Sequence, residues 1–191
     1  MSTICIFGDS ITYGACDYEF GGWANRIVLF LNKLDDFDLT AYNLGIPGDT
    51  TNSLLTRFNI EAKARNPNII IFAVGINDSQ DSTITLTKFK ENLVNLIKKA
   101  REFTNEILFV GLTPVDESIS GIKEDNYFNE KIKKYDLEIK KVCNEEKLKY
   151  IDISGLISSK ELEDGLHPNS KGHEKIFVRA REFLIKNKVI K

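Results

Sequence analysis

The sequence contains little of what disulfide scaffolds, zinc sites and nucleic-acid-binding surfaces require. Its 191 residues include three cysteines, Cys5, Cys16 and Cys143, whose odd number and unpaired spacing argue against a disulfide framework and give no zinc-type ligand set. Reduced thiols favour a reducing compartment, so we expect a cytoplasmic protein. Lysine and arginine together number 26 against 28 aspartates and glutamates, and a net charge of -2 provides no basic excess for nucleic acid.

The chain also lacks a long hydrophobic run. Its longest apolar stretch, residues 69–76, is far shorter than the roughly 20 apolar residues that a membrane-spanning helix needs. The N-terminus has no basic flank, and Gly8-Asp9 interrupts the apolar residues that follow it, so we expect no signal peptide. We therefore predict no stable insertion into a membrane.

What the sequence does contain is a regular alternation of short apolar runs with longer amphipathic segments. Strands are expected at residues 4–7, 39–44, 69–74, 107–112 and 149–153. Helices are expected at residues 22–34, 52–64, 89–103, 126–146 and 173–186. This order is typical of the α/β class, with a parallel sheet covered by helices on both faces, and we predict one domain over residues 1–191.

Glycine-rich and polar turns follow four of these strands. They are Gly8-Asp9-Ser10, residues 45–49, residues 75–78 and, at the end of a longer loop, residues 164–168. Because ligands of open parallel sheets bind beyond the carboxyl ends of the strands, these turns are expected to meet at one edge. The first turn is not a G-x-G-x-x-G fingerprint, and the chain contains no Walker A sequence, so nucleotide binding loses its main support.

The residues in these turns suit acyl transfer. A serine nucleophile, Ser10, needs a base, and His167 is one of only two histidines in the chain. Asp164 lies three residues before His167, where its carboxylate can reach Nδ1 and leave Nε2 for Ser10. Candidate donors to an oxyanion are the backbone N–H groups of Ser10 and Gly48 and the side-chain amide of Asn77.

Each residue also has a simpler interpretation. Ser10 can cap a helix, Gly48 can belong to an ordinary loop before a helix, and Asn77-Asp78 is a common turn pair. Asp9 and Asp78 are expected to hold their loops through hydrogen bonds to nearby backbone N–H groups. His173 is expected to be a surface or packing residue at the start of the last helix.

Taken together, the four turns resemble those of the SGNH hydrolases, the GDSL esterase and lipase family. The motifs are Gly8-Asp9-Ser10, Gly48 in Gly-Asp-Thr, Asn77 in Gly-Ile-Asn-Asp, and Asp164-x-x-His167-Pro168, in the family's order over nearly the whole chain. The resemblance implies a three-layer α/β/α, flavodoxin-like fold and hydrolysis of ester bonds. It implies that Ser10 is the nucleophile, His167 the base and Asp164 its partner, with an oxyanion hole from Ser10, Gly48 and Asn77. The first motif has Ile11 where the family has leucine, which keeps an apolar side chain there.

The substrate is expected to be a small ester. The residues expected to line the substrate pocket are Tyr13, Ile46, Ile76, Val115 and Leu166. The chain is short and shows no obvious lid insertion, so we predict a preference for acyl groups from acetyl to butyryl. We expect no cofactor and no metal ion.

Three alternatives stay open at this point. A metal-dependent phosphoesterase would use the aspartates, Asn77 and His167 as ligands, although two histidines make a poor two-metal site. A non-catalytic flavodoxin-like module would bind phosphate or flavin with its glycine-rich loops. A cysteine enzyme would use Cys16, whose surroundings resemble no cysteine motif. A homo-oligomer is compatible with the sequence.

Overall fold

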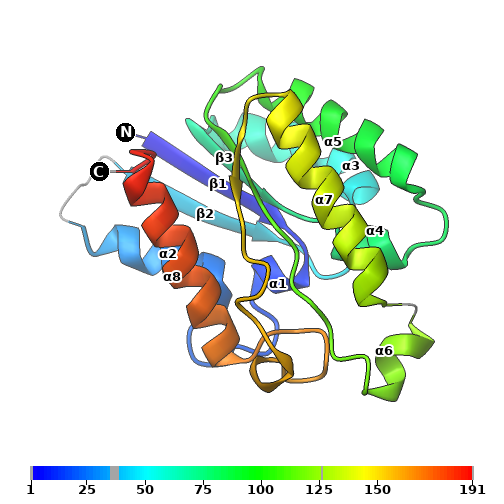
Figure 1. The fold of residues 1–191 in the computed structure, drawn as a ribbon. Helices are drawn as coiled ribbons and strands as arrows, with labels where there is room; N and C mark the ends of the chain where they lie inside the picture. Colours follow the sequence, from blue (N-terminus) through cyan, green and yellow to red (C-terminus); the bar gives the residue numbers. More distant parts are fainter. Residues whose placement is uncertain (1, 35–38, 126, 191) are drawn as a thin grey trace.

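Five short apolar runs pair into one parallel sheet. The computed structural model describes residues 2–34, 39–125 and 127–190. Its strands are β1 (Ser2–Gly8), β2 (Leu39–Gly45), β3 (Ile69–Ala73), β4 (Ile107–Val110) and β5 (Lys149–Ile151), in the order β2-β1-β3-β4-β5 (Figure 1). The predicted α/β class with a five-stranded parallel sheet is confirmed.

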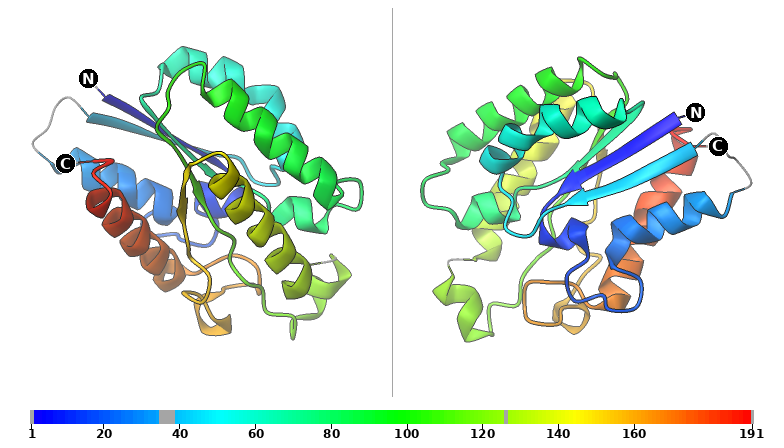
Figure 2. Two further views of the ribbon diagram at one scale, coloured as in Figure 1. Left: turned by 45° about the horizontal axis from the view of Figure 1, so that its top comes forward. Right: turned by 180° about the vertical axis from the view of Figure 1, so that it is seen from behind.

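The long helices form two layers around this sheet. They are α2 (Gly22–Asn32), α3 (Thr51–Arg65), α5 (Leu86–Ala100), α7 (Asn129–Glu145) and α8 (Ser170–Lys186). Helix α2 packs against α8, and α5 packs against both α3 and α7. Figure 2 shows these two groups on opposite faces of the sheet, which gives the predicted three layers. Among the described residues, no helix combines the length and apolar composition needed to cross a membrane.

Several short helices lie where turns or loops were expected. They are α1 (Ser10–Tyr13), α4 (Ile76–Gln80), α6 (Ser120–Glu124) and the 3₁₀ helix η1 (Ser159–Glu161). A helix of one turn is too short to show a hydrophobic period, which explains why the sequence pattern does not reveal them. The predicted start of α7 at Asn126 lies outside the described residues, and α8 begins three residues earlier than predicted because Asn169 caps it.

Aromatic packing holds the centre of the sheet where the first strand ends. The ring of Phe7 lies 5.0 Å from that of Phe58 on α3, and Phe72 on β3 lies 5.1 Å from Phe109 on β4, centroid to centroid. These side chains are fully buried or nearly so. Ser10 therefore follows, by only three residues, one of the best-packed positions in the core.

Candidate active site

The carboxyl end of β1 places Ser10 at the start of a one-turn helix. Gly8 ends the strand, and a Cβ there would collide with the backbone oxygen of Ala73 and the side chain of Thr12. Asp9 caps α1 because its carboxylate accepts a hydrogen bond from the Ile11 N–H at 3.0 Å. Strand, cap and one helical turn thus fix the backbone on both sides of Ser10.

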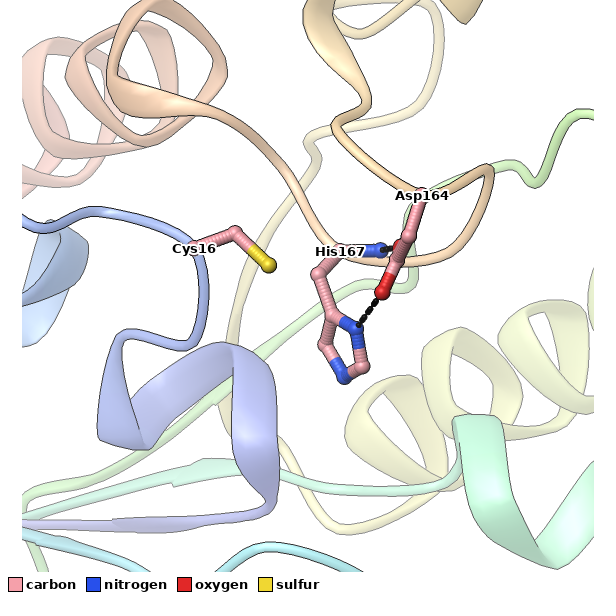
Figure 3. Close-up of side chains that lie close together, drawn as sticks. All are labelled: Cys16, Asp164 and His167. Carbon is pink, nitrogen blue, oxygen red and sulfur yellow. Dashed lines mark hydrogen bonds and ion pairs between the residues drawn. The ribbon is translucent and has the colours of Figure 1, made fainter.

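Ser10, His167 and Asp164 form a continuous chain of hydrogen bonds. His167 Nε2 lies 2.9 Å from Ser10 Oγ, and His167 Nδ1 lies 2.7 Å from Asp164 Oδ2. Figure 3 shows the Asp164 carboxylate facing the imidazole from the same turn. The geometry brings together the three residues that the sequence analysis proposed as nucleophile, base and partner.

Backbone hydrogen bonds hold the Asp164 carboxylate in place. Its Oδ1 accepts the N–H groups of Leu166, at 3.0 Å, and of His167, at 2.7 Å. Partial burial disfavours the charge, but the hydrogen bonds from His167 and Leu166 outweigh it and hold the pKa of Asp164 below its ordinary value. A carboxylate charged at neutral pH keeps the imidazole proton on Nδ1, which leaves Nε2 as the acceptor for the Ser10 hydroxyl.

The three proposed oxyanion donors follow three different strands, with Ser10 after β1, Gly48 after β2 and Asn77 after β3. Neither the Ser10 N–H nor the Gly48 N–H has a hydrogen-bond acceptor among the described residues. Gly48 has φ +82°, and a Cβ there would meet nothing within 4 Å. Glycine is therefore needed for the left-handed backbone, not for the close approach of a neighbouring atom.

The Asn77 amide has a defined orientation. Its Nδ2 donates to the backbone oxygen of Asp49 at 2.9 Å, and its Oδ1 accepts from the Tyr127 hydroxyl at 2.7 Å. Burial, with the charges of Asp9 and Asp125, raises the pKa of Tyr127 to about 12, so its phenol stays protonated and donates. The amide keeps a second N–H for a ligand.

Buried carboxyl groups support the loops around the site, as predicted for Asp9 and Asp78. Asp78 accepts the Thr51 N–H at 3.0 Å, and also the Thr51 hydroxyl, which joins α4 to the start of α3. Burial raises the pKa of Asp78 to about 6 and that of Asp9 to about 7. Both carboxyl groups have a structural role. Asp9 accepts a backbone N–H from its own turn, and Asp78 accepts one from the start of α3.

One guanidinium joins the ends of β1 and β2 to the loop that carries Gly48. Arg57 donates through Nε to Asp49 Oδ2 at 2.7 Å and through Nη2 to the backbone oxygens of Leu44, at 2.8 Å, and Gly8, at 3.3 Å. The planar fork suits several acceptors at once. Arg57 therefore fixes the relative positions of the loops that hold Ser10 and Gly48.

The residues predicted to line a substrate pocket differ in accessibility. Tyr13 is 56% exposed, Ile46 is 44% exposed and Leu166 is partly buried. Ile76 and Val115 are 1% and 5% exposed, because their side chains pack into the hydrophobic core. These two side chains therefore offer little surface to a ligand, and their contact with a substrate stays a prediction.

His173 is a packing residue and lies outside the hydrogen-bonded chain. Its Nδ1 accepts the Trp23 N–H at 3.2 Å, so its Nε2 carries the proton and donates to the Ala15 oxygen at 3.0 Å. Burial lowers the pKa of this fully buried imidazole and keeps it neutral. His173 thereby fastens α8 to the loop that follows α1.

Sequence reasoning missed Tyr127 and Arg57. Tyr127 bonds to a residue 50 positions away, and Arg57 bonds to Gly8, 49 positions away. No local motif marks either residue, because each contact exists only once the strand order brings the loops together. A tyrosine just before a charged helix, or an arginine within a helix, is common at positions that have no part in a functional site.

Comparisons with known proteins cover this same set of turns. Residues 6–175 match the sequence model of the family described as "GDSL-like Lipase/Acylhydrolase family", a segment that contains Ser10, Gly48, Asn77, Asp164 and His167. A multidomain esterase of Ruminococcus flavefaciens is 37% identical over 120 residues, which are 60% of this chain and 15% of that protein. The uncharacterized lipoprotein YqeF of Bacillus subtilis is 28% identical over 120 residues, 60% of this chain and 49% of that protein. The chain thus spans half or less of the length of these curated relatives.

Solved structures extend the likeness to the whole fold. The lipase/acylhydrolase from Enterococcus faecalis is 25% identical, with a TM-score of 0.82 over 98% of this chain and 97% of that one. A catalytic mutant of Axe2, an acetylxylan esterase from Geobacillus stearothermophilus, is 19% identical, with a TM-score of 0.76 over 96% of this chain and 93% of that one. The second likeness concerns the fold alone.

Proposed function

Because the chain belongs to the GDSL-like lipase/acylhydrolase family, we propose that it is a serine esterase that hydrolyses small carboxylic esters. The observation that carries the proposal is the hydrogen-bonded chain from Ser10 Oγ through His167 to Asp164, with distances of 2.9 and 2.7 Å. A serine hydroxyl is a weak nucleophile unless a base takes its proton. This chain of contacts provides the base and fixes its tautomer.

The proposed first half-reaction forms an acyl-enzyme. Ser10 Oγ attacks the ester carbonyl while its proton passes to His167 Nε2, and the Asp164 carboxylate stabilises the imidazolium. His167 then gives this proton to the leaving alcohol as the tetrahedral intermediate collapses. In the second half-reaction a water molecule, deprotonated by His167, attacks the acyl group and releases the acid with Ser10 restored.

Stabilisation of the oxyanion is assigned to the three donors around Ser10. The N–H groups of Ser10 and Gly48 and the second N–H of Asn77 are available to a ligand at the start of the reaction. Each such donor typically lowers the barrier by about 3 to 4 kcal/mol. Arg57 and Tyr127 contribute indirectly, since they position the Gly48 loop and the Asn77 amide.

The preferred acyl group is proposed to be short, from acetyl to butyryl. Two facts support this preference. The accessible apolar side chains among the proposed substrate contacts are limited to Tyr13, Ile46 and Leu166, because Ile76 and Val115 are buried. A long acyl chain gains about 0.8 kcal/mol for each buried CH₂, and that gain requires an apolar surface to bury it.

Hydrolysis of p-nitrophenyl acetate, butyrate and octanoate tests this proposal. Wild type, Ser10→Ala and the control Ser82→Ala, which changes an exposed serine outside the site, are compared with and without a chelator. We expect wild type and Ser82→Ala to hydrolyse the acetate and butyrate fastest, and Ser10→Ala to lose several orders of magnitude in kcat.

The same assay separates the alternatives. Rates that rise steadily to the octanoate would contradict the short-chain preference. Equal activity of Ser10→Ala and wild type would contradict the nucleophile. Loss of activity with the chelator, together with hydrolysis of bis-p-nitrophenyl phosphate, would favour the metal-dependent phosphoesterase, and a coloured inactive protein would favour the flavin-binding module.

A further inference from the structure

A cysteine thiol lies beside the imidazole and carboxylate of the proposed triad. Ligand atoms of Cys16, Asp164 and His167 all lie within 4.8 Å of one another. Figure 3 shows the Cys16 side chain pointing toward the pair from the loop after α1, a segment distant in sequence from the Asp164–His167 turn. A sulfur, a nitrogen and an oxygen atom that can each bind a metal ion therefore lie close together beside Ser10.

From this cluster we propose that Cys16, Asp164 and His167 form an inhibitory binding site for a thiophilic divalent cation, with zinc as the best match. Zinc takes thiolate, imidazole and carboxylate ligands in tetrahedral geometry at about 2.0–2.3 Å. Donor atoms of such a site lie roughly 3.3–3.8 Å apart, so side-chain movements of about 1 Å or less assemble three ligands. Water completes the coordination. Binding of zinc to these three residues does not depend on the proposed esterase function, whereas the inhibitory effect of zinc rests on that function.

The loop that carries Cys16 is held in a fixed conformation. Cys16 has φ +67°, and its neighbour Ala15 accepts the hydrogen bond from His173. Asp17, the next residue, accepts the Gly22 N–H at 3.1 Å and Arg26 Nε at 3.1 Å. The thiol is therefore presented by a braced loop, and little ordering is needed when a cation binds.

Charge and access also suit a cation. The Asp164 side chain is 49% exposed and that of His167 is 20% exposed, so the cluster opens to solvent. The carboxylates of Asp164 and Glu163 place negative charge beside the Cys16 thiol. The same negative charges attract a dication, which displaces the thiol proton when it binds.

Binding there removes the base from the proposed mechanism. His167 Nδ1 faces Asp164, and a cation on Nδ1 replaces the proton that the two residues share. The neutral imidazole then carries its one proton on Nε2, which can no longer accept the Ser10 proton. The thiol proton goes to solvent, so one proton is released for each cation bound.

Two measurements on the full, tag-free chain test the site. The first measures zinc binding by competition with a chromogenic chelator, and cadmium binding by the ultraviolet absorption of the sulfur–cadmium bond, in wild type and Cys16→Ala. We expect one site per chain in wild type and a loss of affinity of at least about 10-fold in Cys16→Ala, because even outer-shell partners of metal ligands contribute about 10–100-fold. Cys5 and Cys143 are buried and present in both proteins, so they serve as the internal control.

The second measurement follows p-nitrophenyl acetate hydrolysis with added zinc or magnesium, with each protein normalised to its own uninhibited rate. We expect zinc to inhibit wild type, a chelator to reverse the inhibition, and magnesium to have no effect because it prefers oxygen ligands. Equal zinc affinity in wild type and Cys16→Ala would overturn the proposal. If the protein has no esterase activity, the binding measurement alone tests the zinc site. If Cys16→Ala does not fold, Asp164→Asn replaces it, and we expect this variant to bind zinc more weakly too.

Discussion

At the scale of single residues, Tyr127 makes one of the two hydrogen bonds that orient the Asn77 amide, and the backbone oxygen of Asp49 accepts the other. Asn and Gln amides can present either end to a ligand, and only the nitrogen end stabilises an oxyanion. The Tyr127 hydroxyl donates to Asn77 Oδ1 at 2.7 Å and is 8% exposed as a residue, so solvent cannot easily replace it. Tyr127 is thus a positioning residue, because it acts through Asn77 and not on the substrate.

Replacing Tyr127 by phenylalanine is expected to lower kcat while leaving KM nearly unchanged. Loss of one oxyanion donor costs about 100–1000-fold in kcat, so a donor that is present but misoriented is expected to cost about 10-fold or more. Steady-state kinetics with p-nitrophenyl acetate give the two constants separately.

Tyr135→Phe is the matched control for this prediction. Tyr135 is also buried, and its hydroxyl donates to the backbone oxygen of Ile84 instead of Asn77. We expect Tyr135→Phe to lose stability without a selective loss of kcat. Equal kcat in wild type and Tyr127→Phe would show that Asn77 does not depend on this hydrogen bond.

At the scale of elements, the loop between β2 and α3 shows how backbone conformation serves the site. Arg57 and Asp49 brace this loop, and Thr50 caps α3 by accepting the Ser53 N–H. Gly48 directly precedes Asp49 and Thr50 and has φ +82°. A residue with a Cβ strains this conformation by about 1–2 kcal/mol, even where space is open.

Gly48→Ala is expected to lose both stability and kcat. Gly155→Ala is a close control, since Gly155 also has a positive φ of +74° and open space where its Cβ would lie, but belongs to the loop after β5. We expect urea denaturation to show a similar loss of about 1–2 kcal/mol in both variants. Only Gly48→Ala is expected to lose kcat, and an equal loss in Gly155→Ala would mean that strain alone impairs activity.

The elements also show what a sequence can reveal. The strand Ile69–Ala73 is predicted to within a few residues because it is a continuous apolar run, and the long helices because their hydrophobic period repeats over several turns. The helix α1 is different, since it has four residues, too few for any period, and begins at Ser10, the last residue of the Gly8-Asp9-Ser10 motif. Residue types alone were enough to propose a role for Ser10, whereas the helical geometry of that turn could not be predicted from them.

At the scale of the whole molecule, the strand order decides which turns meet. Placing β1 between β2 and β3 brings the loops with Ser10, Gly48 and Asn77 together, and the long segment after β5 adds Asp164 and His167. This convergence follows from a parallel sheet in general terms, so the proposed triad could be named from the sequence. The contacts of Arg57, Tyr127 and Cys16 could not, because they depend on side-chain directions in the assembled loops.

Burial of Asp9 beneath the site is expected to affect the pH dependence of folding. The pKa of Asp9 rises from an ordinary value of 3.8 to about 7 in the folded protein. Between these two pKa values the folded state holds a proton that the unfolded state releases. The contribution of protonated Asp9 to the free energy of unfolding is therefore fully present below about pH 4 and is lost as pH rises through about 7. Asp9→Asn keeps an acceptor for the Ile11 N–H and removes this titration.

Urea denaturation of wild type and Asp9→Asn at pH 5 and pH 8 measures this effect. We expect the free energy of unfolding of wild type to fall relative to Asp9→Asn by up to about 1.4 kcal/mol per pH unit within the window. Asp116→Asn is the control, because hydrogen bonds from Ser118 hold the pKa of Asp116 below its ordinary value and outside this range. A pH-independent difference between wild type and Asp9→Asn would contradict the assignment.

Covalent labelling with a fluorophosphonate, followed by peptide mapping in a mass spectrometer, tests the central claim most directly, because it requires no knowledge of the substrate. The reagent traps a serine that a neighbouring base activates. We predict one label per chain, on Ser10, and at least about 1000-fold slower labelling in His167→Ala, in keeping with the cost of losing a triad member. A label on another residue, or equal rates in wild type and His167→Ala, would contradict the account.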